Sequence, residues 1–162
     1  VTTANFLAYV DARRFDGSTF YRAMKIGDNG EYGLVQGGLR GNPYKLYKAI
    51  AHEATSATGL SHVDGAISMA RAEPGSATAD FFIVVGNLTS LDASDSDPGY
   101  AAFGRVVAGM ETVRAMLDLP RSDVAPVEAM KGQMLAEPVR ILSVRRAATG
   151  PAPSAPATDA HR

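Results

Sequence analysis

Two short apolar runs lie near the middle of the chain, at 66–70 and 81–85. Each is bounded by turn-forming residues and is rich in β-branched or aromatic side chains, so each is predicted to be a buried strand. The connector between them contains Pro74 and Gly75, followed by small residues that would let its backbone lie flat against a neighbour. The pattern therefore predicts two core strands. It leaves open whether the connector is a simple hairpin loop or the wall of a groove.

Hydrophobic patterning predicts four further strands and two helices around this centre. The segment 2–13 has apolar residues at helical spacing, and so does 110–119, which ends before Pro120 because proline cannot continue a helix. The predicted strands are 19–24, 32–38, 100–107 and 137–145. The chain is therefore predicted to be mainly β with two helices.

Composition and net charge indicate a globular protein and say little more about its function. Of the 162 residues, 46% are hydrophobic and 20% are charged, and the formal net charge is −1, so nothing indicates nucleic acid or a membrane surface as a partner. The absence of cysteine excludes a disulfide framework and a thiolate nucleophile. We expect one domain over 1–147 and a disordered tail, rich in proline and alanine, over 148–162.

Four sequence blocks follow one another along the chain. They are Ala4-Asn5-Phe6, then Phe20-Tyr21-Arg22 with Gln36-Gly37-Gly38, then Ser68-Met69-Ala70 with Phe81-Phe82-Ile83, then Phe103-Gly104-Arg105-Val106. Together they resemble the cyclophilins, the cyclosporin-binding family of peptidyl-prolyl cis-trans isomerases. The resemblance covers roughly residues 1 to 147 and implies an antiparallel β-barrel capped by helices.

The resemblance also implies a set of site residues. Arg22 matches the family's catalytic arginine, and Gln36 matches the glutamine that holds the carbonyl side of the substrate and helps to orient the arginine. Ala70 and Arg71 lie where the family's backbone pairs with the substrate chain. The positions that match the apolar pocket for the proline ring are Leu34, Phe82, Leu91 and Tyr100.

Several positions depart from the family pattern. Asp80 replaces the usual glutamine and places a charge beside the groove. Ser90 stands where eukaryotic members carry the tryptophan that binds cyclosporin, so we expect weak cyclosporin binding at most. The family's groove phenylalanine has no clear equivalent, and Tyr32 or Leu34 is expected to take its place. These departures resemble the bacterial branch of the family, which favours the periplasm over the cytoplasm as location.

The chain begins at Val1, whereas cyclophilins normally start with two more β-strands. We therefore expect a processed chain or a fragment that lacks the N-terminal hairpin. The final strand would then have a free edge, and the chain would be less stable than a version extended by two strands.

The predicted function is isomerisation of X–Pro bonds in unfolded proteins or peptides, without metal or cofactor. His52-Glu53 is not part of an HExxH motif, and the acidic loop after Asp92 does not have the spacing of an EF-hand. Two alternatives remain open. One is a proline-peptide binding module or chaperone with weak or no catalysis, and the other is an inactive fragment.

Overall fold

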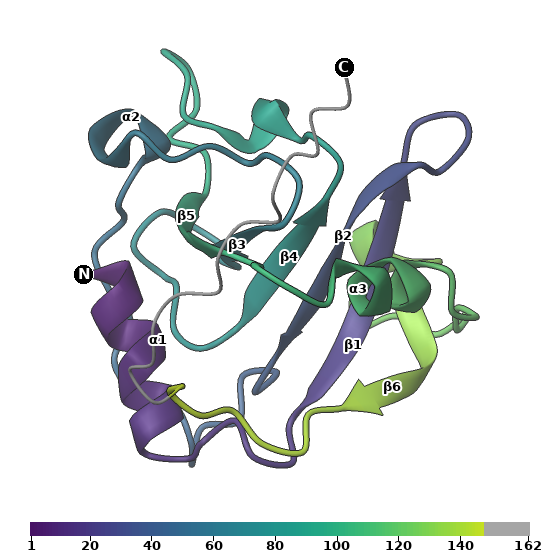
Figure 1. The fold of residues 1–162 in the computed structure, drawn as a ribbon, viewed down its shortest axis with the longest axis horizontal. Helices are drawn as coiled ribbons and strands as arrows, with labels where there is room; N and C mark the ends of the chain where they lie inside the picture. Colours follow the sequence, from purple (N-terminus) through teal and green to yellow (C-terminus); the bar gives the residue numbers. More distant parts are fainter. Residues whose placement is uncertain (148–162) are drawn as a thin grey trace, which may run out of the picture.

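A six-stranded antiparallel sheet forms the centre of the computed structural model, which describes residues 1–147 (Figure 1). Its spatial order is β5-β3-β4-β2-β1-β6. The strands are β1 (Thr19–Ile26), β2 (Tyr32–Gly38), β3 (Ala66–Met69), β4 (Phe81–Val85), β5 (Ala101–Arg105) and β6 (Met134–Arg140). The helices are α1 (Thr2–Asp11), α2 (Thr55–Thr58) and α3 (Met110–Leu117), with 3₁₀ turns η1 (Thr89–Leu91) and η2 (Glu128–Met130). No helix among the described residues has the length and apolarity needed to cross a bilayer.

The strand predictions match closely except at the end of the chain. The predicted strands 32–38 and 81–85 have the bounds of β2 and β4, but β6 spans Met134–Arg140 instead of 137–145. Beyond β6 the chain runs toward α1, where Arg145 and Arg146 pair with Asp16 and Asp11. In the described part of the chain β5 and β6 are the two edges, so the sheet is not closed. The tail predicted for 148–162 lies outside the described residues.

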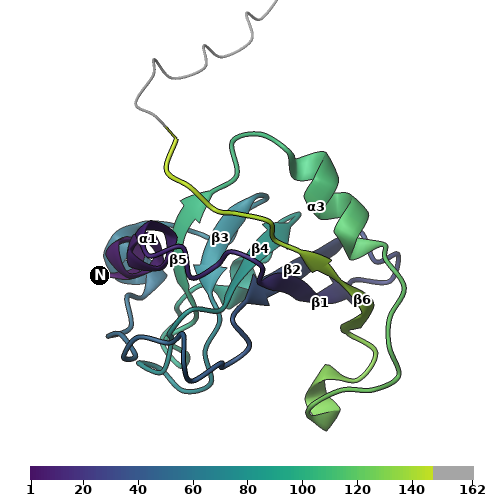
Figure 2. The same cartoon turned by 90° about the horizontal axis from the view of Figure 1, so that it is seen from below.

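One face of the sheet is covered by α3 (Figures 1 and 2). The helix buries Val113, Met116 and Leu117, as its apolar spacing predicts, in a cluster with Val35 and Ile83. Its last turn is closed by the side chain of Arg121, which donates hydrogen bonds to the carbonyl oxygens of Leu117, Leu119 and Ala23. This arginine fixes the start of the long segment that leads to β6.

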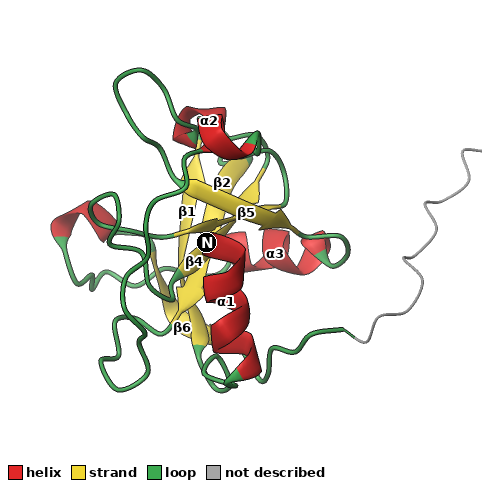
Figure 3. Ribbon diagram, turned by 90° about the vertical axis from the view of Figure 1, so that its left-hand side faces the viewer, coloured by secondary structure: helices red, strands yellow, loops and turns green. Residues whose placement is uncertain are grey.

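The first helix packs beside the sheet near β5 (Figure 3). Its Phe6 ring lies 5.1 Å from Phe15, 5.3 Å from Phe81 and 5.1 Å from Phe103, measured between ring centroids. The Glu53 carboxylate accepts hydrogen bonds from the backbone nitrogens of Val1 and Thr2, at 2.8 and 2.6 Å, and so caps the first turn of α1.

A third apolar cluster contains Leu34, Phe82 and Val84, with Leu91 and Tyr100 packed against it. Because side chains alternate along a strand, Val35 and Ile83 contact α3 while Leu34 and Phe82 belong to this other cluster. The connector between β3 and β4 fits both interpretations of the sequence. The two strands pair as antiparallel neighbours, with Met69 opposite Phe81, and the long connector lines a cavity.

Candidate active site

A β-bulge in β1 orients the central polar residues. Phe20 lies opposite Gly37 and Arg22 lies opposite Gln36, so Tyr21 is an extra residue on β1. A bulge re-aims the side chains around it. Phe20 packs into the core, while Tyr21 and Arg22 both contact Gln36. Gly37 is required here, because a Cβ atom would lie 2.7 Å from Cδ1 of Phe20.

Two glutamines hold the guanidinium of Arg22. Its Nη1 donates to Oε1 of Gln36 at 2.8 Å, and its Nε and Nη2 donate to Oε1 of Gln133 at 2.9 and 2.6 Å. Gln36 is buried and donates from Nε2 to the Tyr21 hydroxyl at 2.8 Å. Gln133 donates from its own Nε2 to the Ala129 carbonyl at 3.0 Å, which fixes its orientation. Nη2 also donates to Met24 Sδ at 3.7 Å, so the guanidinium is locked in one direction with one N–H group left on Nη1.

The guanidinium of Arg22 is partly desolvated by burial. Burial lowers the pKa of Arg22, and Tyr21 and Tyr100 act on it in the opposite direction. A guanidinium stays protonated at neutral pH even so. Low local polarity strengthens its interaction with any electron-rich atom that comes within hydrogen-bond distance of its free N–H group.

Next to Arg22 is a small cavity of about 140 Å³ with a mainly apolar lining. Phe82 packs edge-on against Tyr100, with ring centroids 5.6 Å apart, and stacks on His62 at 5.9 Å. The residues around the cavity are Arg22, Met24, Leu34, Gln36, Ala70, Arg71, Phe82, Leu91, Tyr100 and Met130. Of the predicted site residues, only Asp80 is missing from this lining.

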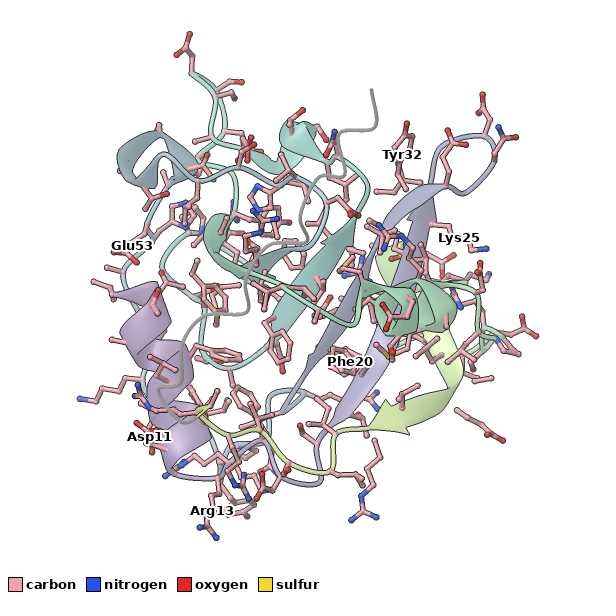
Figure 4. All side chains as sticks on the ribbon, in the orientation of Figure 1. Asp11, Arg13, Phe20, Lys25, Tyr32 and Glu53 are labelled. Atoms are coloured by element: carbon pink, nitrogen blue, oxygen red, sulfur yellow. The ribbon has the colours of Figure 1, made fainter. Side chains whose placement is uncertain are left out.

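Of the two residues expected to replace the groove phenylalanine, Leu34 lies at the cavity and Tyr32 does not. Leu34 lines the cavity together with Met24. Tyr32 is 41% exposed and packs against Gly86, where a Cβ would lie 2.2 Å from the ring. Figure 4 shows Tyr32 at the end of the sheet beside the β1–β2 loop.

The side chain of Arg71 reinforces one wall of the groove. Its Nε and Nη2 donate to the Gly99 carbonyl at 3.0 and 2.5 Å, and its guanidinium lies 4.6 Å from the centre of the Tyr100 ring. The backbone N–H of Ala70 donates to the Asp80 carbonyl on the β4 side. Because backbone groups alternate in direction along an extended chain, those of Arg71 face away from β4.

Asp80 lies in a second, larger cavity of about 580 Å³ that adjoins the first. Gln36, Ala70, Arg71 and Met130 line both cavities. The Asp80 carboxylate accepts a hydrogen bond from the Arg40 backbone N–H at 2.9 Å. Asp80 is thus separated from Arg22 and the apolar cavity by Gln36 and Tyr21.

A buried histidine fixes the wall that carries Leu91 and Tyr100. The ring of His62 is fully buried, with Nδ1 2.6 Å from Asp92 Oδ1 and Nε2 2.9 Å from Ser68 Oγ. Asp92 also accepts hydrogen bonds from the Ser61 hydroxyl and the His62 backbone N–H. His62 is thus a buried histidine with both ring nitrogens in hydrogen-bond contact.

Sequence reasoning missed the contributions of Tyr21, Met24, Met130 and Gln133 to these two cavities and to the Arg22 network. Gln133 lies in the segment between α3 and β6, which has no periodicity to reveal its direction. Only the folded chain brings it to Arg22, across 111 positions in the sequence.

Comparison with known proteins gives one consistent result. The family described as "Cyclophilin type peptidyl-prolyl cis-trans isomerase/CLD" matches residues 1–146. A peptidyl-prolyl cis-trans isomerase from Acinetobacter baylyi is 32% identical over 146 residues, which are 90% of this chain and 73% of that protein. Peptidyl-prolyl cis-trans isomerase A from Dickeya dadantii is 35% identical over 132 residues, 79% of this chain and 65% of that protein.

Comparison of the fold with solved structures gives a relative of the same type. A crystal structure of a cyclophilin type peptidyl-prolyl cis-trans isomerase from Cryptosporidium parvum, in the presence of the dipeptide Ala-Pro, superposes with a TM-score of 0.60 at 21% identity. The match covers 86% of this chain and 84% of that one. The six-stranded sheet and its helices are therefore a cyclophilin fold.

Proposed function

Because the chain belongs to the cyclophilin-type peptidyl-prolyl cis-trans isomerases, we propose that Arg22 is the group that stabilises the twisted X–Pro amide during isomerisation. As a member of this family the chain is a peptidyl-prolyl cis-trans isomerase that acts on proline-containing peptides. The observation that carries the proposal is the clamp of Gln36 and Gln133 on Arg22, at the edge of an apolar cavity.

The chemistry of the reaction explains why an arginine suffices. Rotation about an X–Pro bond must break amide resonance against a barrier of about 18–20 kcal/mol. In the twisted amide the prolyl nitrogen regains its lone pair. A cationic N–H donor aimed at that nitrogen stabilises the twisted amide more than either planar isomer, which is what lowers the barrier. No nucleophile, proton relay or metal takes part in such a step.

The neighbouring residues would place the substrate. The proline ring would enter the cavity formed by Leu34, Phe82, Leu91 and Tyr100, and the substrate chain would pair as an added strand with the backbone of Ala70 and Arg71. One amide hydrogen of Gln36 is used by Tyr21. The second is free to hold the carbonyl of the residue before proline.

Substitutions at Arg22 test this role. We expect Arg22→Ala to lower kcat/KM for an Ala-Pro peptide on the order of 100-fold, as for removal of a preorganised donor in other enzymes. Arg22→Lys should also be poor, because an ammonium cannot bind both glutamines as a planar fork does. A protease-coupled assay measures the rates and thermal melting checks the fold. Arg105→Ala, at an exposed arginine on β5, is the matched control. Near-full activity in a folded Arg22→Ala variant would contradict the assignment.

Weak cyclosporin binding belongs to the same proposal. Ser90 is exposed in η1, next to the cavity residue Leu91, and it offers neither the apolar area nor the N–H of an indole. We expect Ser90→Trp to tighten cyclosporin binding, measured by calorimetry, with Thr89→Ala as a control on the same turn. Tight binding by the unmodified chain would show that Ser90 does not occupy the position assigned to it.

Two finer points stay proposals supported by the relatives. Bacterial isomerases are among the similar proteins, and we propose a periplasmic location over a cytoplasmic one. Unfolded proteins are proposed as substrates alongside short peptides. When a substrate binds as an added strand, most contacts are made to its backbone and its proline, so the other side chains matter less.

A further inference from the structure

Building on the proposed function, we propose that the cavity around Asp80 selects substrates with a lysine or arginine two residues before the proline. The cavity is about 580 Å³ and adjoins the apolar cavity for the proline ring. Asp80 is its only carboxylate among the described residues. The proposal concerns which proline sites this chain acts on.

The direction of the substrate follows from Gln36. If Gln36 holds the carbonyl of the residue before proline, the preceding chain runs past Gln36 toward Tyr21, whose hydroxyl is 2.8 Å from Gln36 Nε2. Tyr21 and Asp80 line the same cavity. In an extended chain, residues two apart face the same side. The residue two before proline therefore reaches the Asp80 cavity when the proline occupies its own.

The Asp80 carboxylate is half-buried and makes no ion pair in the described part of the chain. Burial raises its pKa, while hydrogen bonds from the Arg40 backbone and from Tyr21 act in the opposite direction. The charge of Arg40 also acts to lower this pKa, but no lysine or arginine among the described residues forms an ion pair with the carboxylate. An ammonium or guanidinium group of a substrate can therefore complement it. The hydrogen bond from the Arg40 backbone holds the carboxylate, which packs closely on Gly38, where a Cβ would lie 2.2 Å from Oδ1.

Two arginines also line the cavity, but other groups hold them. The guanidinium of Arg40 lies 4.9 Å from the centre of the Tyr21 ring. That of Arg71 donates to the Gly99 carbonyl and lies over Tyr100, and its side chain is only 10% exposed. The side-chain oxygens of Ser76 and Thr78 lie on the same lining and can accept the remaining N–H groups of a bound lysine or arginine.

The test compares three peptides that differ only at the residue two before proline. They are Lys-Ala-Pro-Phe, norleucine-Ala-Pro-Phe and Glu-Ala-Pro-Phe, and norleucine matches the length of lysine without its charge. Exchange NMR gives kcat/KM without a coupling protease. We expect lysine to exceed norleucine by roughly three- to tenfold, the range for one partly buried charged contact, and glutamate to be the poorest.

Asp80→Asn keeps the shape and the acceptor for Arg40 but removes the charge, so the lysine-to-norleucine ratio should fall to about one. Asp80→Gln repeats the test if the asparagine variant does not fold. Asp95→Asn removes the same charge from an exposed position between η1 and β5 and should leave the ratio unchanged. Equal rates on the lysine and norleucine peptides, or a ratio that survives in Asp80→Asn, would overturn the inference. Absence of turnover on all three peptides would instead contradict the proposed function.

Discussion

At the scale of single residues, the site depends on how Arg22 is held. Burial and two glutamines leave the guanidinium one orientation, so its donors need no rearrangement when the amide twists. Gln133 is the less obvious partner. The guanidinium donates three hydrogen bonds to glutamine oxygens, and Gln133 accepts two of them.

Removing Gln133 should therefore affect the chemical step more than binding. We expect Gln133→Leu to lower kcat about tenfold with KM nearly unchanged, since the orientation of Arg22 is lost but the apolar cavity is kept. Gln133→Asn should restore part of the rate, because it retains the amide oxygen. Lys131→Ala, at an exposed position on the same segment, is the control. A rise in KM without a change in kcat would assign Gln133 to substrate binding.

The residue scale also marks the limit of prediction from sequence. Arg22 and Gln36 could be predicted because they belong to a motif with characteristic neighbours. Gln133 could not, because its partner is 111 positions away and its own segment is irregular. Asp80 could be recognised as a departure, but its separation from Arg22 by Tyr21 and Gln36 depends on the bulge in β1.

At the scale of elements, the η1 turn is tied to the sheet through His62 and Asp92. Leu88, the residue just before the turn, donates to the His62 carbonyl at 2.8 Å, and Tyr100 donates to the Leu91 carbonyl at 3.0 Å. The histidine–carboxylate contact beneath Phe82 is thus one of several that hold the cavity wall, beside the hydrogen bonds from the Ser61 hydroxyl and the His62 backbone N–H to Asp92. Partial burial acts to raise the pKa of Asp92, but hydrogen bonds from Ser61 and His62 outweigh it and lower the pKa.

This pKa shift predicts an acid-sensitive contribution to stability. Because the pKa of Asp92 is lower in the folded chain, the unfolded chain binds more protons as pH falls through about 4. The stabilisation is present above that range and is lost below it. Asp92→Asn should lower the free energy of unfolding at pH 7 by about 1–3 kcal/mol and flatten its acid dependence. Denaturant titrations at pH 3 to 7 measure both, and an unchanged slope would exclude this role for Asp92.

The ends of a strand are predicted correctly where the hydrophobic pattern is sharply bounded. They are predicted wrongly where pairing with a neighbouring strand determines the end. The apolar runs of β2 and β4 are short and sharply bounded, so their predicted ends are correct. The predicted end of β6 is wrong because Leu142 and Val144 continue the apolar pattern after the strand has left β1. The bulge at Tyr21 leaves no mark in the hydrophobic pattern, since Phe20 and Tyr21 are both compatible with a strand.

At the scale of the whole molecule, β6 is an edge of the sheet among the described residues. Its first residues are covered, since Leu135 forms a bridge with Arg121 and the Ala136 N–H donates to the Pro120 carbonyl, so the free edge predicted for the final strand begins after Ala136. Ile141 exchanges backbone hydrogen bonds with Gly17 and Ser18 on the β1 side. Alternation along the strand then directs the nitrogen of Pro138 outward. Proline at this position removes a donor from the open edge and limits pairing with another chain.

Restoring that donor should promote association. We expect Pro138→Val to form dimers or larger species at concentrations where the unmodified chain is monodisperse, measured by light scattering coupled to size-exclusion chromatography. Pro43→Val, at an exposed proline between β2 and α2, is the comparison. If both variants keep the unmodified elution profile, Pro138 does not protect the edge. The expected gain in stability from two further N-terminal strands stays a prediction.

The most direct test of catalysis by Arg22 separates turnover from binding in one sample. Exchange NMR on an Ala-Pro peptide reports cis–trans interconversion, and chemical-shift titration in the same tube reports binding. We predict fast interconversion with the unmodified chain. With Arg22→Ala we predict a similar dissociation constant but interconversion slowed on the order of 100-fold. Binding without accelerated exchange by the unmodified chain would contradict catalysis by Arg22 and identify a proline-peptide binding module.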